Sequence, residues 1–143
     1  MATINTDLVF NGNCKEAFDF YKSVFGGEYS YVGKYKEMPS KDGRKFSAQD
    51  AEKIMHISLP ISKETSLMGN DYIEGFGNKT IFGNNFSLSI DSESKEEADK
   101  LFGALSEGGK VTMPMDNTFW DAYFGMFTDK FGINWMVSFQ KKQ

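Results

Sequence analysis

Apolar and polar positions recur with two different periods along the chain, and the first half shows the order clearly. The run Ile4–Phe10 predicts a strand. Apolar residues then recur at three- and four-residue spacing over Cys14–Phe25, which predicts a helix with one apolar stripe. Asn13 stands three residues before Glu16, a pattern typical of an N-cap with a capping box. Gly26-Gly27 supplies the left-handed residue that commonly ends a helix.

The second half repeats this order. Over residues 86–91, Phe, Leu and Ile alternate with Ser, Ser and Asp, which predicts a half-buried strand. Ser94 with Glu97 gives a second N-cap, an apolar stripe runs on to Leu105, and Gly108-Gly109 follows. The same supersecondary unit is therefore present twice. A half that cannot bury its own sheet face needs its twin.

Strand-like runs follow each predicted helix. They are Glu28–Tyr35, Ile54–Ile61 and Ser66–Met68 in the first half, and Lys110–Met113, Ala122–Thr128 and Ile133–Phe139 in the second. The polar run 39–44 predicts a loop or hairpin tip, and Asp129–Gly132 predicts a turn. We therefore expect an α+β fold. Two βαβββ modules form mixed sheets with helices outside and a concave cavity shared between the modules.

We expect one domain over residues 1–143, with module one at 1–71, a connecting flap at 72–84 and module two at 85–143. The connecting region is rich in glycine but also holds Tyr72, Ile73, Phe76, Ile81 and Phe82. A long loop of this kind is often a binding lid. The alternative is a hydrophobic flap that packs on the sheet or on a second subunit.

The composition excludes several classes of partner. The net charge of −4 and the lack of a basic stripe argue against nucleic acid. No apolar run approaches the roughly 20 residues of a membrane span, and the N-terminus lacks the basic and long apolar regions of a signal peptide. A single cysteine, Cys14, cannot form an internal disulfide, and its place on the apolar stripe predicts a buried, inert thiol. We expect a cytoplasmic protein.

Three separate motifs, in the same order along the chain, resemble the PhnB-like proteins, which are often labelled demethylubiquinone methyltransferase-like. The matching segments are Asn11–Tyr21, Leu67–Asp71, Thr118–Trp120 and Asp129–Met136, the last two counting as one motif. These proteins belong to the glyoxalase/bleomycin-resistance/extradiol-dioxygenase superfamily, with the vicinal oxygen chelate fold. The resemblance implies the βαβββ pair, commonly as a homodimer. The superfamily includes metal-dependent lyases, isomerases and dioxygenases as well as drug-binding proteins without catalysis.

The resemblance also allows a test for a metal site. In metal-using members, four ligands come from the first and last strands of each module, typically His or Gln paired with Glu. The matching positions in this sequence are Thr6 (with Asp7 beside it), Met68, Ser87 and Met136. Thioethers and hydroxyls are poor ligands for a hard or borderline divalent cation. We therefore expect no metal and no cofactor.

His56 is the only histidine and the candidate catalytic residue. Alternation places His56 and Ser58 opposite Met55, Ile57 and Leu59, so both face the concavity if helices cover the apolar side. The alternative is a sheet histidine that is hydrogen-bonded to a neighbour.

The other candidate ligand contacts are aromatic, amide and thioether side chains. Trp120 and Tyr123 can each present a flat face with one polar group, although core packing or a dimer contact would also explain them. Asn134 and Met136 share the strand face opposite the predicted core. The full predicted set is Thr6, His56, Ser58, Met68, Trp120, Tyr123, Asn134 and Met136.

Three functions remain open at this point. The favoured one is a small-molecule binder for a ligand with an aromatic or apolar body. The second is a glyoxalase-type metal-dependent lyase or isomerase with an altered ligand set, such as His56 with Asp7 or Asp71. The third is a dimeric structural or assembly protein.

Overall fold

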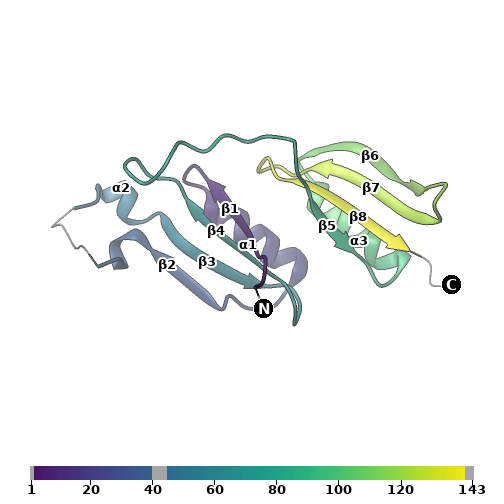
Figure 1. Ribbon diagram of the computed structural model, residues 1–143, viewed down its shortest axis with the longest axis horizontal. Helices are drawn as coiled ribbons and strands as arrows, with labels where there is room; N and C mark the ends of the chain where they lie inside the picture. The colour runs from purple at the N-terminus through teal and green to yellow at the C-terminus, as the bar shows by residue number, and fades with distance from the viewer. Residues whose placement is uncertain (1, 40–44, 141–143) are drawn as a thin grey trace. The chain divides into compact units, whose positions relative to one another are not determined.

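The chain divides into two compact units, Met1–Ile81 and Phe82–Gln143. The computed structural model (Figure 1) describes residues 2–39 and 45–140. The boundary between the units falls inside the predicted connecting region 72–84. The two units are described separately below. The module limits 1–71 and 85–143 and the cavity shared between the modules stay predictions.

The first unit contains a four-stranded sheet. Its elements are β1 (Thr6–Phe10), α1 (Cys14–Phe25), β2 (Tyr31–Lys34), the 3₁₀ helix η1 (Tyr35–Glu37), α2 (Ala48–Ala51), β3 (Ile54–Pro60) and β4 (Ser66–Asp71). The strand order is β1-β4-β3-β2. β1 is parallel to β4, and the other neighbours are antiparallel.

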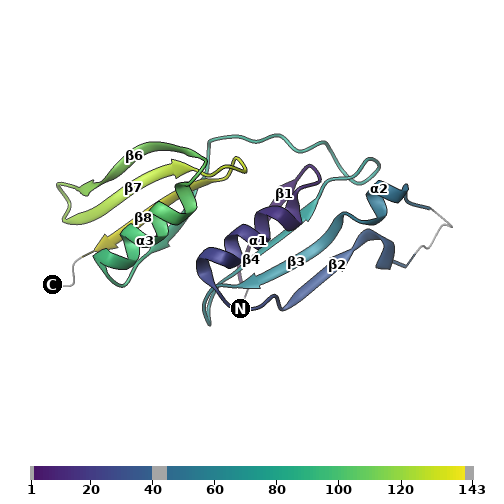
Figure 2. The ribbon, with the colours of Figure 1, turned by 180° about the vertical axis from the view of Figure 1, so that it is seen from behind.

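The second unit repeats this arrangement. Its elements are β5 (Leu88–Asp91), α3 (Lys95–Ser106), β6 (Lys110–Asn117), β7 (Ala122–Thr128) and β8 (Asn134–Gln140). The order β5-β8-β7-β6 matches that of the first unit, with β5 parallel to β8. Figure 2 shows α1 and α3 each lying across one face of its own sheet. The predicted duplication and the α+β fold class are confirmed.

The core of the first unit lies between α1 and the sheet. The Phe18 ring contacts Phe10 of β1 edge to face, with ring centroids 6.3 Å apart. Gly69 of β4 lies directly under Phe18, because a Cβ there would be 2.6 Å from Phe18 Cε1. A glycine in the strand therefore makes room for the helix.

The core of the second unit is built in the same way. Phe102 of α3 contacts Phe127 of β7 at a centroid distance of 5.1 Å. Trp135 and Val137 of β8 are buried on the same side, together with Leu105 of α3. The helix stripe and the alternate strand residues thus form one apolar layer.

The two predicted helix caps have different outcomes. Ser94 caps α3 as predicted, since its Oγ accepts a hydrogen bond from Glu97 N at 3.0 Å. Asn13 occupies the predicted N-cap position of α1, but the predicted side-chain capping bond is wrong, because the Asn13 side chain makes none. Asp71 Oδ1 instead accepts from Gly12 N at 3.0 Å and Cys14 N at 2.9 Å. A carboxylate distant in sequence has replaced the local cap.

Some strand limits differ from the prediction. β4 continues through the polar residues to Asp71, because β1 pairs with it along its length. β6 continues to Asn117 across Pro114, with irregular register, and an edge strand can accommodate a proline. The short helix α2 was not predicted. Residues 40–44 of the predicted polar loop lie outside the described residues.

The segment after β4 packs on the first unit before it crosses to the second. Ile73 is buried, and the Phe76 ring lies 5.8 Å from Tyr35 and 6.0 Å from Phe46, centroid to centroid. Beyond the boundary, Gly83 O accepts a hydrogen bond from Asn134 Nδ2 at 3.0 Å. Residues 72–84 contain no helix or strand.

Among the described residues, no helix combines the length and apolar character that a bilayer crossing requires.

Candidate functional site

Each sheet has one face covered by a helix and one face without a helix, which we call the open face. In the first unit the register places Asp7 opposite Met68, and Met68 opposite Ser58. Val9 lies opposite Asn70, and His56 opposite Gly33. Since alternate residues share a face, the open face of this sheet carries one carboxylate, one imidazole, one thioether and small polar groups.

His56 lies beside an aromatic ring on this open face. The Tyr31 ring is 5.7 Å from the imidazole, centroid to centroid. Burial raises the pKa of the Asp7 carboxyl, and the nearby His56 offsets part of that shift. In the described part of the chain, no hydrogen bond joins the side chains of Asp7, His56 and Ser58, so a catalytic role of His56 stays a prediction.

Thr6 differs from the other predicted contacts of the first unit. It has the same alternation as Leu8 and Phe10, which are buried on the helix-covered side. Its neighbour Asp7 takes the open-face position, opposite Met68. A strand is present here as predicted, but the residue of this strand on the open face is Asp7, one position after the predicted Thr6.

The open face of the second unit contains a hollow of about 600 Å³. The lining residues come from β5 and the turn after it, from β7 and the hairpin before it, and from β8. They are Ser89, Asp91, Ser92, Trp120, Ala122, Phe124, Met136, Ser138 and Gln140. This is the size of a small-molecule site.

The hollow has an apolar side and a polar side. Trp120 and Phe124 lie 6.1 Å apart, centroid to centroid, and Met136 adds a thioether. On the polar side, Ser138 Oγ donates to Asp91 Oδ1 at 3.1 Å. Ser92 Oγ is buried without a hydrogen-bond partner among the described residues. The arrangement can therefore hold a flat apolar body and hydrogen-bond its edge.

A tight hairpin between β6 and β7 places Trp120 at the hollow. Thr118 closes the hairpin, since its N–H donates to Ala122 O at 2.8 Å and its Oγ1 accepts from Ala122 N at 3.2 Å. Asp121 has φ +63°, the left-handed region that residues with a Cβ rarely adopt. Phe119 is 95 % exposed and contacts Trp120 edge to face at 4.9 Å.

Replacing Asp121 with Gly is expected to raise the free energy of unfolding of the second unit by about 0.5–1 kcal/mol, because glycine adopts positive φ without the Cβ penalty. Urea denaturation followed by tryptophan fluorescence measures this, since both tryptophans, Trp120 and Trp135, belong to this unit. Asp116→Gly in β6 is the control and is expected to destabilise. Equal effects of the two substitutions would contradict the assignment of strain to Asp121.

Tyr123 lies away from this hollow. Its hydroxyl donates to Asp99 Oδ1 of α3 at 2.5 Å, and the Lys95 ammonium lies 4.8 Å from its ring centroid. Tyr123 therefore belongs to the helix-covered side of β7. Asn134 has the open-face alternation of Met136, and its amide is held by Thr128 and Gly83. Of the predicted contacts in this unit, the structure places Trp120 and Met136 in the hollow.

Sequence reasoning missed the polar side of the hollow. Ser89 and Asp91 follow the period of two within β5, opposite Met136 and Ser138 of β8. Phe124 lies opposite Ser138 from the other side. Alternation along each strand could have indicated these residues, but the pairing of β5 with β8 was needed to bring them together.

The donor atoms do not fit a resident divalent cation. Within residues 2–39 and 45–140, no three side chains of His, Cys, Asp or Glu gather as metal ligands would. The first unit offers Asp7 beside Met68. In the second unit Ser89, and not the predicted Ser87, lies opposite Met136, because β5 begins at Leu88. A thioether or hydroxyl in place of imidazole and carboxylate is a poor donor for such an ion. The side chains at these positions therefore differ from the ligand set of a metal-using member.

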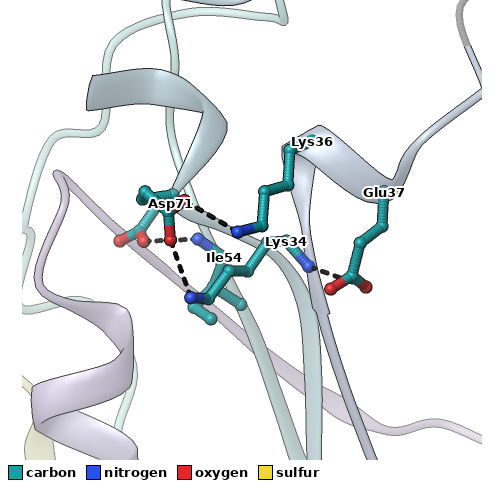
Figure 3. Close-up of polar contacts among 6 residues, drawn as sticks. Lys34, Lys36, Glu37, Ile54 and Asp71 are labelled. Carbon is teal, nitrogen blue, oxygen red and sulfur yellow. Dashed lines mark hydrogen bonds and ion pairs between the residues drawn. The ribbon is translucent and has the colours of Figure 1, made fainter. Parts of the chain in front are cut away.

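Asp71 is not available as a ligand either. Its side chain is buried and accepts three backbone N–H groups, from Gly12, Cys14 and, at 2.9 Å, Ile54. Figure 3 shows the carboxylate against Ile54 N. Burial, together with the Asp71 charge, raises the pKa of the Cys14 thiol, so this cysteine is a poor nucleophile.

The ammonium groups of Lys34 and Lys36, also labelled in Figure 3, lie at the surface. Both pair with Glu52, each at 2.8 Å. Exposed pairs of this kind contribute little to stability.

Comparison with known proteins decides the family. The family model described as 3-demethylubiquinone-9 3-methyltransferase matches residues 2–138. This chain belongs to that family. Protein YjdN of Escherichia coli is 32% identical over 148 residues, covering 95% of this chain and 94% of YjdN.

Solved structures agree with this assignment. The protein PA1353 from Pseudomonas aeruginosa is 39% identical with a TM-score of 0.83, over 99% of this chain and 100% of that one. A putative 3-demethylubiquinone-9 3-methyltransferase, PhnB protein, from Bacillus cereus is 26% identical with a TM-score of 0.73, over 96% and 99%. A glyoxylase/bleomycin resistance protein/dioxygenase domain from Frankia, 14% identical with a TM-score of 0.65 over 99% and 98%, shares the fold.

Proposed function

We propose that this protein binds a small molecule with a flat, apolar body in the hollow of the second unit's open face. The observation that carries the proposal is the hollow itself, with two aromatic rings and a thioether on one side and hydroxyl and carboxylate groups on the other. Ligand sites in proteins commonly combine an apolar lining with a few polar groups that orient the ligand.

Each side of the hollow supports one part of this function. Trp120 is 50 % exposed, so a planar ligand that covers its ring removes apolar surface from water. Phe124 extends the same surface. On the other side, the Asp91 carboxylate and the Ser138 hydroxyl can hydrogen-bond the polar edge of a ligand.

The lining favours binding over catalysis. It contains one carboxylate and no histidine, lysine or cysteine. A serine nucleophile is weak without an adjacent base, and the one carboxylate, Asp91, accepts a hydrogen bond from Ser138. The methyltransferase description belongs to the family, and these side chains support ligand contact rather than proton transfer.

Binding is tested by isothermal titration of the protein with a set of small planar aromatic compounds of different charge: neutral lepidine (a methylquinoline), cationic N-methylquinolinium and anionic naphthoate. We expect saturable binding of at least one compound. The substitution Trp120→Ala should weaken it about tenfold, because an aromatic contact contributes about 0.5–1.5 kcal/mol beyond its buried area.

Phe119→Ala is the matched control. Phe119 precedes Trp120 in the hairpin but does not line the hollow, so its removal should change the affinity by less than about twofold. Absence of saturable binding for every compound, or equal affinity of the Trp120→Ala variant and the unchanged protein, would refute the proposal.

A further inference from the structure

Asp91 is the one charged side chain among the residues that line the hollow. It lies at the end of β5, is exposed, and accepts a hydrogen bond from Ser138 Oγ at one of its two carboxylate oxygens. No lysine, arginine or histidine forms an ion pair with Asp91 within the described part of the chain. Its negative charge therefore remains uncompensated beside the hollow.

The aromatic side of the hollow adds to this negative potential. The faces of Trp120 and Phe124 carry the negative part of the ring quadrupole. A cation over such a face gains about 0.5–1 kcal/mol at an exposed site and up to about 2 kcal/mol when it is desolvated. A carboxylate opposite the rings attracts the same charge.

No positively charged side chain in the lining favours an anion. The lining contains no lysine, arginine or histidine. The whole chain carries a net charge of −4, which also disfavours the approach of anions. An anionic ligand would have to lie beside Asp91 without a compensating positive side chain.

We infer that the ligand class of this hollow is a cationic aromatic molecule, such as an aromatic amine or an N-alkylated heteroaromatic ring. The ring lies against Trp120 and Phe124, and the positive charge is directed toward Asp91. This inference rests on the proposed function, because it specifies the charge of the ligand that the hollow binds.

The test compares the affinities of the three compounds at mildly alkaline pH. N-methylquinolinium and lepidine differ chiefly in charge, since lepidine carries its methyl group on carbon and stays neutral. We expect N-methylquinolinium to bind about tenfold more tightly than lepidine, and naphthoate to bind most weakly. Raising the ionic strength should reduce the difference between the cation and lepidine.

Substitutions assign the preference to Asp91. Asp91→Asn should bring the affinities for N-methylquinolinium and lepidine within about threefold of each other, and Asp91→Lys should favour naphthoate over the cation. Glu96→Gln removes the same charge from the exposed surface of α3 and should leave the preference unchanged. Circular dichroism confirms that each variant folds.

The outcomes separate this inference from the proposed function. If lepidine and N-methylquinolinium bind equally well, or if Asp91→Asn keeps the tenfold preference, the inference is wrong while the binding function stands. If none of the three compounds binds, both are wrong. If Glu96→Gln removes the preference as fully as Asp91→Asn does, the preference comes from net charge, and the inference is also wrong.

Discussion

Replacing Asp71 with Ala is expected to lower the free energy of unfolding of the first unit by about 3–5 kcal/mol. Three N–H groups, of Gly12, Cys14 and Ile54, donate to this buried carboxylate at 2.9–3.0 Å. Alanine leaves all three donors without a partner, and an unsatisfied buried donor costs about 1–3 kcal/mol. Urea denaturation followed by far-ultraviolet circular dichroism measures the loss.

Asp19→Ala provides the matched control in the same unit. Asp19 also accepts hydrogen bonds, from Lys15 Nζ and Tyr29 Oη, each at 2.6 Å, but it does so at the surface. Its replacement should therefore cost less than about 1 kcal/mol. Both tryptophans lie in the second unit, so their fluorescence reports the unfolding of that unit. The denaturation curve measured by fluorescence should be the same for the Asp19→Ala variant and the unchanged protein. Similar losses for the two variants would contradict the role given to Asp71.

A second large effect is expected for Gly109→Ala, which should destabilise the second unit by about 2–3 kcal/mol. A Cβ at this position would collide with the carbonyl oxygen of Thr128 and lie 2.9 Å from Asp129 Cα. These are backbone atoms of the neighbouring strand and turn, so a change of rotamer cannot relieve the overlap, and overpacking of this kind costs about 1–3 kcal/mol or more. Denaturation followed by Trp135 fluorescence measures it.

Gly103→Ala is the same substitution in a position with free space. Gly103 lies inside α3, and outside the adjacent residues and the backbone of the helix itself no atom lies within 4 Å of a Cβ built there. Alanine is favoured over glycine in a helix interior by about 1 kcal/mol, so this variant should be more stable than the unchanged protein. Destabilisation by Gly103→Ala, or a neutral effect of Gly109→Ala, would show that the strand contact at Gly109 is not the constraint.

Local pattern was sufficient to predict most of the fold. The helix stripe from Cys14 to Phe25 and the strand Ala122–Thr128 have the predicted limits, because apolar period and flanking glycines act over a few residues. The cap of α1 could not be predicted in this way. It comes from Asp71, brought back to Cys14 by the parallel pairing of β4 with β1.

Asp129 in the second unit is another carboxylate whose hydrogen-bond partners could not all be predicted from the local sequence. The turn Asp129–Gly132 was predicted from its residues, and Gly132 does have φ +91°. The sequence did not indicate that the buried Asp129 carboxylate also accepts from Ile133 N at 3.0 Å and Trp135 Nε1 at 2.8 Å. A polar residue in a turn is usually solvated, so its burial becomes visible only from the fold.

Only part of the candidate site was predicted, because residue type is visible in the sequence and strand pairing is not. Met136 and Trp120 have a chemical character that points to ligand contact by itself, and the structure places both in the hollow. Tyr123 has the same character, but strand alternation places it toward α3, where it bonds Asp99. Asp91 was not predicted, because a carboxylate at a strand end has no distinguishing pattern until β8 lies beside it. Residue type suggested candidates, and strand pairing selected among them.

A methyl NMR titration of the protein, with isotope-labelled methionine, against N-methylquinolinium tests the ligand site most directly. Met136 lies in the hollow beside Phe124 and Ser138, and a bound aromatic ring there shifts its methyl resonance. We expect a saturable shift of the Met136 methyl resonance, assigned by its loss in Met136→Leu, and a much weaker response after Asp91→Asn. Binding that saturates while the Met136 resonance stays unchanged would contradict it.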